Sequence, residues 1–173
     1  VTKVISWGQN PWNRLASAFQ GCVNLITVEK SKFFSDTTLN VSNLFNGCTG
    51  LTSVDFSEWS VTGFVSGQNF ARGCTSLESF KLKGDIKFAN ASSNNYWFRD
   101  SGASAGCLFD ISNVSFVGSI GNQGNVQGWF YDAQIKDGSK FDNWTFPSVS
   151  WALTQFFFDA HVPSNDATIS MQN

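Results

Sequence analysis

A short phrase recurs at a constant spacing in the first half of the chain. It is centred on Cys22, Cys48 and Cys74, which lie 26 residues apart. Each cysteine follows a glycine, has a phenylalanine three or four residues before it, and has a leucine three residues after it. A fixed period of roughly 20–50 residues is typical of solenoids and related arrays. The sequence therefore predicts a stack of equivalent turns.

Each of these leucines opens a second phrase, whose last three residues alternate in polarity. Residues 51–56 are Leu-Thr-Ser-Val-Asp-Phe and residues 77–82 are Leu-Glu-Ser-Phe-Lys-Leu, while residues 25–30 follow the pattern except for the polar Lys30. Alternation with period two predicts a short strand with one buried face. The phrase and its period fit leucine-rich repeats, which run to about 20–29 residues.

A weaker form of the pattern continues toward the C-terminus. Residues 109–114 match residues 54–59, and residues 126–133 match residues 41–48. One anchoring phenylalanine per turn is expected, with one extra residue in the third turn: Phe19, Phe45, Phe70, Phe98, Phe130 and Phe157. We predict a leucine-rich-repeat-like, right-handed stack of about six layers, with short parallel strands and mostly irregular or short helical returns. Residues 1–162 form this single domain, and residues 163–173 a polar tail.

The repeat phrases resemble the BspA-type leucine-rich repeats of bacterial surface proteins and related phage proteins. The resemblance is carried by residues 6–8, 18–25 and 56–62 and extends over roughly residues 4–160. It implies a surface-exposed solenoid for adhesion or display, usually within a larger polypeptide, and it transfers no catalytic residues. The irregular segments and the loss of cysteine from the last turns depart from the family pattern.

Composition narrows the function classes. Charged residues make up 14% of the chain, below the roughly 25% typical of soluble domains. The net charge of -2, without a basic block, argues against nucleic acid as a partner. No apolar run reaches the roughly 18 residues of a membrane span. A neutral polar surface favours an extracellular or cell-surface location, with a virion surface as the alternative, and the ends resemble those of a processed chain or a module.

The cysteines are expected to be buried thiols. Their column continues with small apolar residues: Cys22, Cys48, Cys74, Ala133 and Ala160. A disulfide between successive turns remains the alternative, although parallel Cβ directions disfavour it. Cys107 lies outside the column. Because the chain has no C-x-x-C pair and a single histidine, we predict no metal and no cofactor.

Aromatic residues are expected to fill the interior, since the chain has 18 Phe and 7 Trp against 2 Tyr. The phenylalanine column, Trp59 and Trp144 are interpreted as core. Stacking of these tryptophans on a sugar is the less favoured alternative.

Outward strand positions would meet a partner in a leucine-rich repeat. One charged residue recurs per turn, at Glu29, Asp55, Lys81 and Asp110, and the serines Ser53 and Ser79 lie beside this row. The simpler interpretation is a solvated strand face, and a binding face is the alternative.

Two segments, 84–106 and 118–128, interrupt the period. Insertions in solenoids form loops on one face, which is often the binding face. Four aromatic residues in or beside them are candidates for binding: Tyr96, Trp97, Trp129 and Tyr131. Covering of the core by these rings is an equally open interpretation. The glycines of the second segment do not form a phosphate-binding motif.

No catalytic constellation is present, because His161 stands alone and the nearest carboxylate pair, Asp132 and Asp137, is explained by a loop. We therefore expect a non-enzymatic module for adhesion, display or recognition of a protein or cell-surface glycan, within a larger assembly. The alternative is a structural virion component of a phage, such as a decoration, fibre or filament subunit that self-assembles through lateral contacts. Glycosylation sequons occur at Asn40, Asn90, Asn113 and Asn143.

Overall fold

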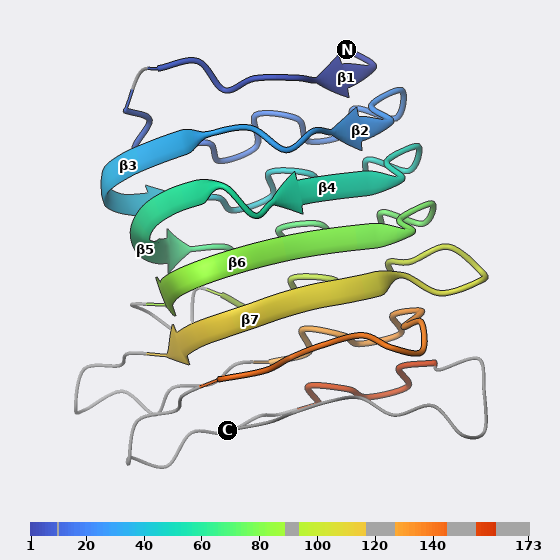
Figure 1. Cartoon of the computed structure of the whole chain (residues 1–173). Coiled ribbons are helices and arrows are strands. Elements are labelled where there is room, and N and C mark those ends of the chain that lie inside the picture. The colour runs from blue at the N-terminus through green and yellow to red at the C-terminus, as the bar shows by residue number, and fades with distance from the viewer. Residues whose placement is uncertain (10, 89–93, 117–126, 145–154, 162–173) are drawn as a thin grey trace.

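Alternating apolar and polar residues place one face of each strand inside a stack of coils. The computed structural model describes residues 1–9, 11–88, 94–116, 127–144 and 155–161. The strands are β1 (Lys3–Val4), β2 (Thr27–Val28), β3 (Phe33–Asn40), β4 (Ser53–Phe56), β5 (Trp59–Ser66), β6 (Ser79–Phe88) and β7 (Leu108–Phe116). No helix occurs among the described residues. The predicted repeat solenoid with parallel strands is confirmed (Figure 1).

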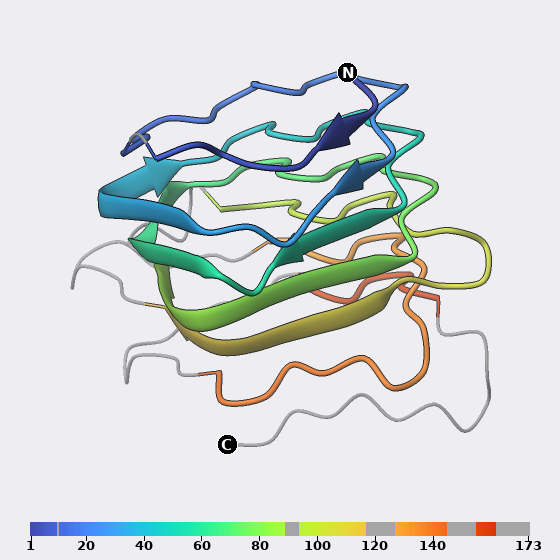
Figure 2. The ribbon, with the colours of Figure 1, turned by 45° about the horizontal axis from the view of Figure 1, so that its top comes forward.

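The strands form one parallel sheet that follows the stacking axis. Its order is β1-β2-β4-β6-β5-β3, and β7 pairs with β6. About four strand-bearing turns are stacked, formed by β2 with β3, by β4 with β5, by β6, and by β7. The long strand β6 pairs with both β4 and β5 and so spans the bend that separates them (Figures 1 and 2).

The strand register confirms the repeat unit. One apolar residue per turn enters the same buried column, which contains Val4, Val28, Val54, Phe80 and Phe109. A second buried column, two residues further along, contains Phe56, Leu82 and Ile111. These columns are the inward half of the polarity alternation seen in the sequence.

The chain returns from one strand to the next through tight turns, which are neither helix nor strand, and none of the described returns contains a short helix. We call the following stretches the return segments: 15–25, 41–51, 67–77, 96–102, 128–134 and 155–161. Within them, bonds inside a turn alternate with bonds between turns. Leu44 N donates to Val41 O at 3.1 Å, and the next amide, Phe45 N, donates to Phe70 O at 2.8 Å. The bonds between successive return segments form a second ladder, which we call the return ladder. The returns are regular because this ladder satisfies their backbone groups.

Left-handed residues explain the glycine of the repeated phrase. Gly21, Gly47 and Gly73 have φ angles of 70°, 74° and 70°. The equivalent residues of the later returns are Asp100, Asp132 and Asp159, with φ angles of 57°, 52° and 50°. Glycine adopts this conformation without strain, and aspartate tolerates it better than most residues do. Such a residue also prevents each return from continuing as a helix.

The hydrogen bonds correct the register predicted for the third turn. Ala71 N donates to Trp97 O at 2.8 Å, just as Phe45 N donates to Phe70 O, so Phe45 pairs with Ala71. The phenylalanine column is therefore Phe19, Phe45, Ala71, Phe98, Phe130 and Phe157. Phe70 lies in the neighbouring column, with Ala18, Leu44, Trp97, Trp129 and Phe156. Both columns face inward, so a Leu-Phe pair in one turn is exchanged for Phe-Ala in the next without an extra residue.

The segments predicted to be irregular are more regular than expected. Residues 84–88 continue β6, and residues 96–101 join the return ladder. Residues 89–93, most of the segment 118–128, and the predicted tail 163–173 lie outside the described residues.

Candidate binding surfaces

The predicted row of charges lies on one outward face of the sheet. Asp55 pairs with Lys81, and Lys81 pairs with Asp110. Glu29 follows Val28, which pairs with Val54, so it continues the same row. We call this surface, with Thr27, Ser53 and Ser79, the strand face. Sequence reasoning placed these residues together correctly.

Charges on the strand face are compensated within the molecule. Lys3 Nζ lies 2.5 Å from Glu29 Oε1, and Lys81 Nζ lies 3.9 Å from Asp55 Oδ2. Lys83 Nζ lies 2.8 Å from Asp110 Oδ2. The hydrogen bond and the charge of Asp110 raise the pKa of Lys83. A face whose charges are already paired attracts a charged ligand weakly.

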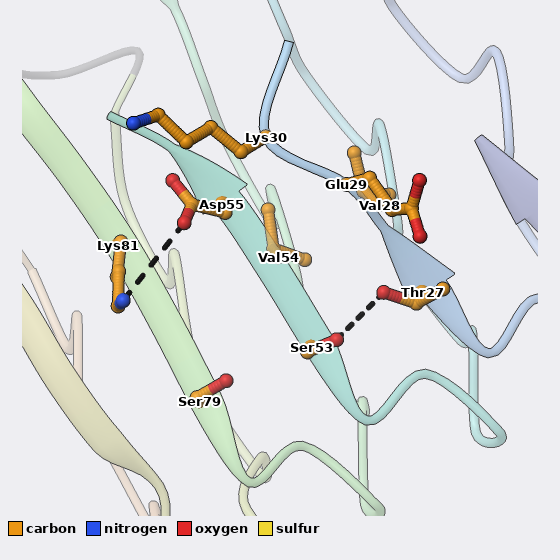
Figure 3. A pocket seen from close by; sticks show the side chains of 9 residues that line it. All are labelled: Thr27, Val28, Glu29, Lys30, Ser53, Val54, Asp55, Ser79 and Lys81. Atoms are coloured by element: carbon orange, nitrogen blue, oxygen red, sulfur yellow. Dashed lines mark hydrogen bonds and ion pairs between the residues drawn. The ribbon is translucent and has the colours of Figure 1, made fainter. Parts of the chain in front are cut away.

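A shallow hollow of about 380 Å³ lies over the strand face (Figure 3). Its walls include the hydroxyl row of Thr27, Ser53 and Ser79, and Thr27 Oγ1 and Ser53 Oγ are 2.7 Å apart. The charged residues of β4 and β6 line the same hollow from one side. Its surface is suited to a polar, extended ligand such as a glycan.

A second cluster of side chains lies on the return segments. The guanidinium carbon of Arg99 is 5.3 Å from the ring centroid of Tyr96 and 4.6 Å from that of Tyr131. Tyr131 stacks on Phe158, with ring centroids 5.1 Å apart. These distances allow cation–π attraction of the guanidinium to both tyrosine rings. We call Tyr96, Arg99, Tyr131 and Phe158, with Arg72 and Asp100, the return cluster.

One carboxylate joins the two arginines of the return cluster. Asp100 Oδ2 lies 3.4 Å from Arg99 Nε and 3.5 Å from Arg72 Nε. Both tyrosines of the chain and two of its three arginines therefore meet at one place. Of these residues, sequence reasoning named only the tyrosines.

The return cluster follows a single outward column of the ladder. The residue before each left-handed glycine or aspartate lies in this column: Gln20, Asn46, Arg72, Arg99, Tyr131 and Phe158. Gly128 makes room for the neighbouring ring, because a Cβ there would lie 2.8 Å from Tyr96 Cδ1. Aligning the chain on this left-handed position would have identified the column from the sequence.

Trp97 and Trp129 are not part of a binding surface. Both are fully buried, and their rings stack with centroids 4.9 Å apart. Trp97 also stacks on Phe70 at 4.5 Å. They lie in the inward column of Leu44 and Phe70, so of the two interpretations left open for these tryptophans the structure favours a place in the core over a binding role. Trp59 and Trp144 are buried, as predicted.

The cysteines are free thiols, and no disulfide forms among them. The inward column of Cys22, Cys48 and Cys74 has one member that the sequence did not reveal, Ser101, which precedes Ala133. Cys48 Sγ donates to Phe19 O at 2.9 Å, and Cys74 Sγ donates to Phe45 O at 3.1 Å.

Burial makes the inner thiols chemically inert. It raises the pKa of Cys48 to about 11 and also raises the pKa values of Cys74 and Cys107 far above their ordinary value. Because the thiolate is the reactive form, such thiols are poor nucleophiles.

A larger hollow, of about 610 Å³, lies beside β3 and the start of β5 and was not predicted. Its lining includes Phe33, Phe34, Lys32 and Ser60. The Phe34 side chain is 61% exposed and contacts no other ring in the described part of the chain. This hollow fits an apolar side chain better than a polar ligand.

Other chemical sites are not formed by the residues that the structure describes. Among them, no group of three histidine, cysteine or acidic side chains could hold a metal ion. No described helix has the length and apolarity that crossing a bilayer requires. His161 is exposed at the end of the last return segment, and Asp137 accepts a hydrogen bond from Gly138 N in a turn.

Comparison with known proteins finds no match for this chain, either among protein-family models, among curated proteins or among solved structures.

Proposed function

We propose that the chain is a non-enzymatic recognition module that binds a protein partner through the return cluster. The observation that carries this proposal is the contact of Arg99 with two tyrosine rings beside an outward column. Tyrosine and arginine are enriched in the energetic centres of protein interfaces. Because the rings and the guanidinium are already stacked, little side-chain freedom is lost on binding.

The return cluster favours a protein over a glycan. A sugar ring stacks on a free aromatic face, whereas Tyr131 lies in the column between Arg99 and Phe158 and contacts both. The side chains of Tyr96, Arg99 and Tyr131 remain partly exposed and can contact side chains and backbone of another protein. The hollow beside Phe34 would accept an apolar anchor from the same class of partner.

We also assign the solenoid to the BspA-type leucine-rich-repeat class, with about six layers and a right-handed coil. The support is the position of Leu25, Leu51 and Leu77. Each is fully buried and lies two residues before the first residue of a strand. Six layers result if each return segment is counted as one. Display at a cell surface, or at a virion surface, follows from this assignment together with the neutral polar composition.

Several properties of the side chains support a function without catalysis. Burial holds the three inner thiols in the protonated form, and the strand-face carboxylates are engaged in ion pairs. Neither set offers a nucleophile next to a base.

The test compares two variants for binding of the labelled chain to intact bacterial cells, with and without protease treatment of the cells. The first variant, Arg99→Ala with Tyr131→Ala, should weaken binding about tenfold or more, because hot-spot truncations exceed about 1–2 kcal/mol. The second variant, Glu29→Gln with Asp55→Asn and Lys81→Gln, should bind within about threefold of the original chain, because its charges are internally paired. Protease treatment should abolish binding.

Equal thermal unfolding midpoints would establish that both variants are folded. Loss of binding in the strand-face variant alone, with protease-resistant binding, would contradict the proposal and would favour a glycan on the strand face.

A structural role within an assembly is the second candidate function. It is favoured by the backbone groups at the two ends of the return ladder that have no partner among the described residues.

A further inference from the structure

Backbone hydrogen bonds between neighbouring return segments all have the same direction of donation in the first part of each segment, up to and including the left-handed glycine or aspartate. In every described pair of this part, the earlier turn donates and the later turn accepts. Examples are Phe19 N to Leu44 O at 3.1 Å, Phe98 N to Trp129 O at 2.7 Å and Asp132 N to Phe158 O at 3.0 Å. This part of the return ladder is therefore polar, with carbonyls facing the N-terminal end and amides facing the C-terminal end.

The direction of donation reverses only after the next residue along the chain, which belongs to the small inward column of the cysteines. There the later turn donates, as in the bonds from Gln134 N to Ser101 O at 2.8 Å and from His161 N to Ala133 O at 2.9 Å. These bonds lie at the exits of the later returns, so they leave the polarity of the preceding positions unchanged.

The two ends of this ladder carry complementary unpaired groups. At the N-terminal end, the carbonyls of Ala16, Ala18 and Gln20 accept no hydrogen bond from any described residue. They are the equivalents of Ser42, Leu44 and Asn46, whose carbonyls all accept one. At the C-terminal end, the amides of Phe157 and Asp159 donate to no described residue. One end supplies acceptors where the other supplies donors at equivalent positions.

The side-chain columns are also left open at both ends. In the middle of the stack, Phe45, Phe98 and Phe130 are fully buried, as are Cys48 and Ala133. At the ends, the same columns terminate in residues that are only partly buried: Phe19, Cys22, Phe157 and Ala160. Among the described residues, each end thus lacks the layer that would complete its packing.

Exposed apolar residues gather in the first turn. Five large apolar side chains with 43–74% exposure lie within the first 26 residues: Val1, Ile5, Trp12, Val23 and Ile26. The edge strand β1 pairs with β2 on one side and with no described strand on the other. An uncovered sheet edge with apolar neighbours is a ready site for pairing with another chain.

We propose that two copies of the chain stack end to end, with the C-terminal return segment of one on the N-terminal return segment of the next. Phe157 N and Asp159 N of one copy donate to Ala18 O and Gln20 O of the other, which continues the ladder in register. Head-to-head contact is excluded, since it opposes carbonyls to carbonyls.

Side chains at the contact offer no obstacle. Asp159 of one copy meets Gly21 of the next, which carries no side chain. Ala160 meets Cys22, which continues the small inward column. Among the described residues of the two return segments, neither bulk nor like charge therefore opposes the contact.

The geometry of this contact sets the form of the assembly. A head-to-tail interface without a closing rotation produces open linear stacks instead of closed rings. The inference is independent of the proposed recognition function, because the return cluster lies on an outward column. Stacking would repeat that cluster along one side of the filament and raise avidity for a multivalent partner.

The first experiment follows the mass of the 173-residue chain by light scattering from low micromolar to millimolar concentration. The expected result is a rise through dimers to longer species. In parallel, hydrogen exchange of the Phe157 and Asp159 amides should slow as concentration rises. A monomer at all concentrations, with both amides exchanging freely, would overturn the proposal.

The second experiment blocks one end at a time. Ala18→Glu places a charge on the N-terminal end, and Ala160→Glu places one on the C-terminal end. Each variant alone should remain monomeric, whereas an equimolar mixture should form dimers and nothing longer, because only one open pair of ends remains. Ala105→Glu, the same substitution at an exposed position in the middle of the stack, is the matched control and should assemble like the original chain.

Unchanged unfolding midpoints would show that the blocked variants are folded. Assembly of either blocked variant alone, or no dimer in the mixture, would contradict head-to-tail stacking.

Discussion

The early and late return segments share one backbone and differ in their outward side chains. In the early returns, residues 15–51, the outward column carries glutamine and asparagine, the left-handed position is glycine, and the small inward column is cysteine. In the late returns, residues 96–161, arginine, tyrosine and phenylalanine lie outward, and aspartate and serine or alanine replace glycine and cysteine. Residues 67–77 combine the two, with Gly73 beside Arg72. All of them make the same inter-turn hydrogen bonds up to the left-handed residue.

This comparison shows at which positions the fold restricts the side chain and at which positions the side chain is free to vary. The two large inward columns hold only apolar side chains, and the exchange of Leu44-Phe45 for Phe70-Ala71 keeps one large ring in each pair. The outward columns have no such requirement, so amides in one region are replaced by the return cluster in the other. The surface that we propose for recognition is thus carried by a repeated frame that it does not alter.

The largest effect on stability is expected from truncating inward side chains. Comparing such variants tests whether the early and late returns depend equally on core packing. Trp97→Ala should lower the free energy of unfolding by about 3–5 kcal/mol, since Trp97 is fully buried between Phe70 and Trp129. Leu44→Ala, at the equivalent early position, should lower it by about 2–5 kcal/mol. Urea denaturation measures both. A change below about 1 kcal/mol for Trp97→Ala would show that the late returns are not packed as described.

The next prediction concerns the thiols, which lie mainly toward the N-terminal end. Burial raises the pKa of Cys48 from 9.0 to about 11, so its contribution to stability is complete below pH 9 and is lost as the pH rises toward 11. The free energy of unfolding should fall in that window by up to about 1.4 kcal/mol per pH unit for each buried thiol.

Replacing Cys48, Cys74 and Cys107 together by alanine should flatten this alkaline slope. Denaturant titrations from pH 8 to 11, with the original chain as reference, measure it. An identical slope in the two proteins would contradict the burial of the thiols.

A smaller effect is expected at the left-handed position. Gly47→Ala should destabilise the chain by about 1–2 kcal/mol, because an alanine with a φ of 74° is strained. Gly47→Asp, which copies the late returns, should cost clearly less. Thermal unfolding of the two variants compares the regions directly, and equal losses would show that aspartate at this position is not an equivalent solution.

The smallest effect is expected for the strand face. Lys83→Gln should change stability by less than about 1 kcal/mol, because the ion pair with Asp110 is partly exposed to solvent. The raised pKa of Lys83 means that this contribution is present below its ordinary pKa and is lost at alkaline pH above it. Unfolding at low and high salt measures the contribution, and a larger loss that resists salt would indicate a buried pair instead.

Side-chain burial explains which features could be predicted from the sequence. The solenoid, the inward columns and the charge row of Asp55, Lys81 and Asp110 were predictable, because buried positions repeat a narrow choice of residues. The return ladder was not predictable, because it joins backbone groups. Its only sign in the sequence is the repeated glycine. Arg99 and Phe158 were missed because outward columns impose no periodicity. The register at Phe70 was predicted wrongly because phenylalanine was matched with phenylalanine. Two neighbouring inward columns share the space of the core, and in this turn the phenylalanine lies in the other column.

The return ladder is tested most directly by hydrogen exchange of individual amides in the monomeric chain. Slow exchange is expected in both regions at the inter-turn donors Phe45, Ala71, Phe98 and Phe130. Free exchange is expected at Phe157 at low concentration. Protection of Phe45 and Ala71 with free exchange at Phe98 and Phe130 would show that the late returns do not share the ladder, and would contradict a single continuous solenoid.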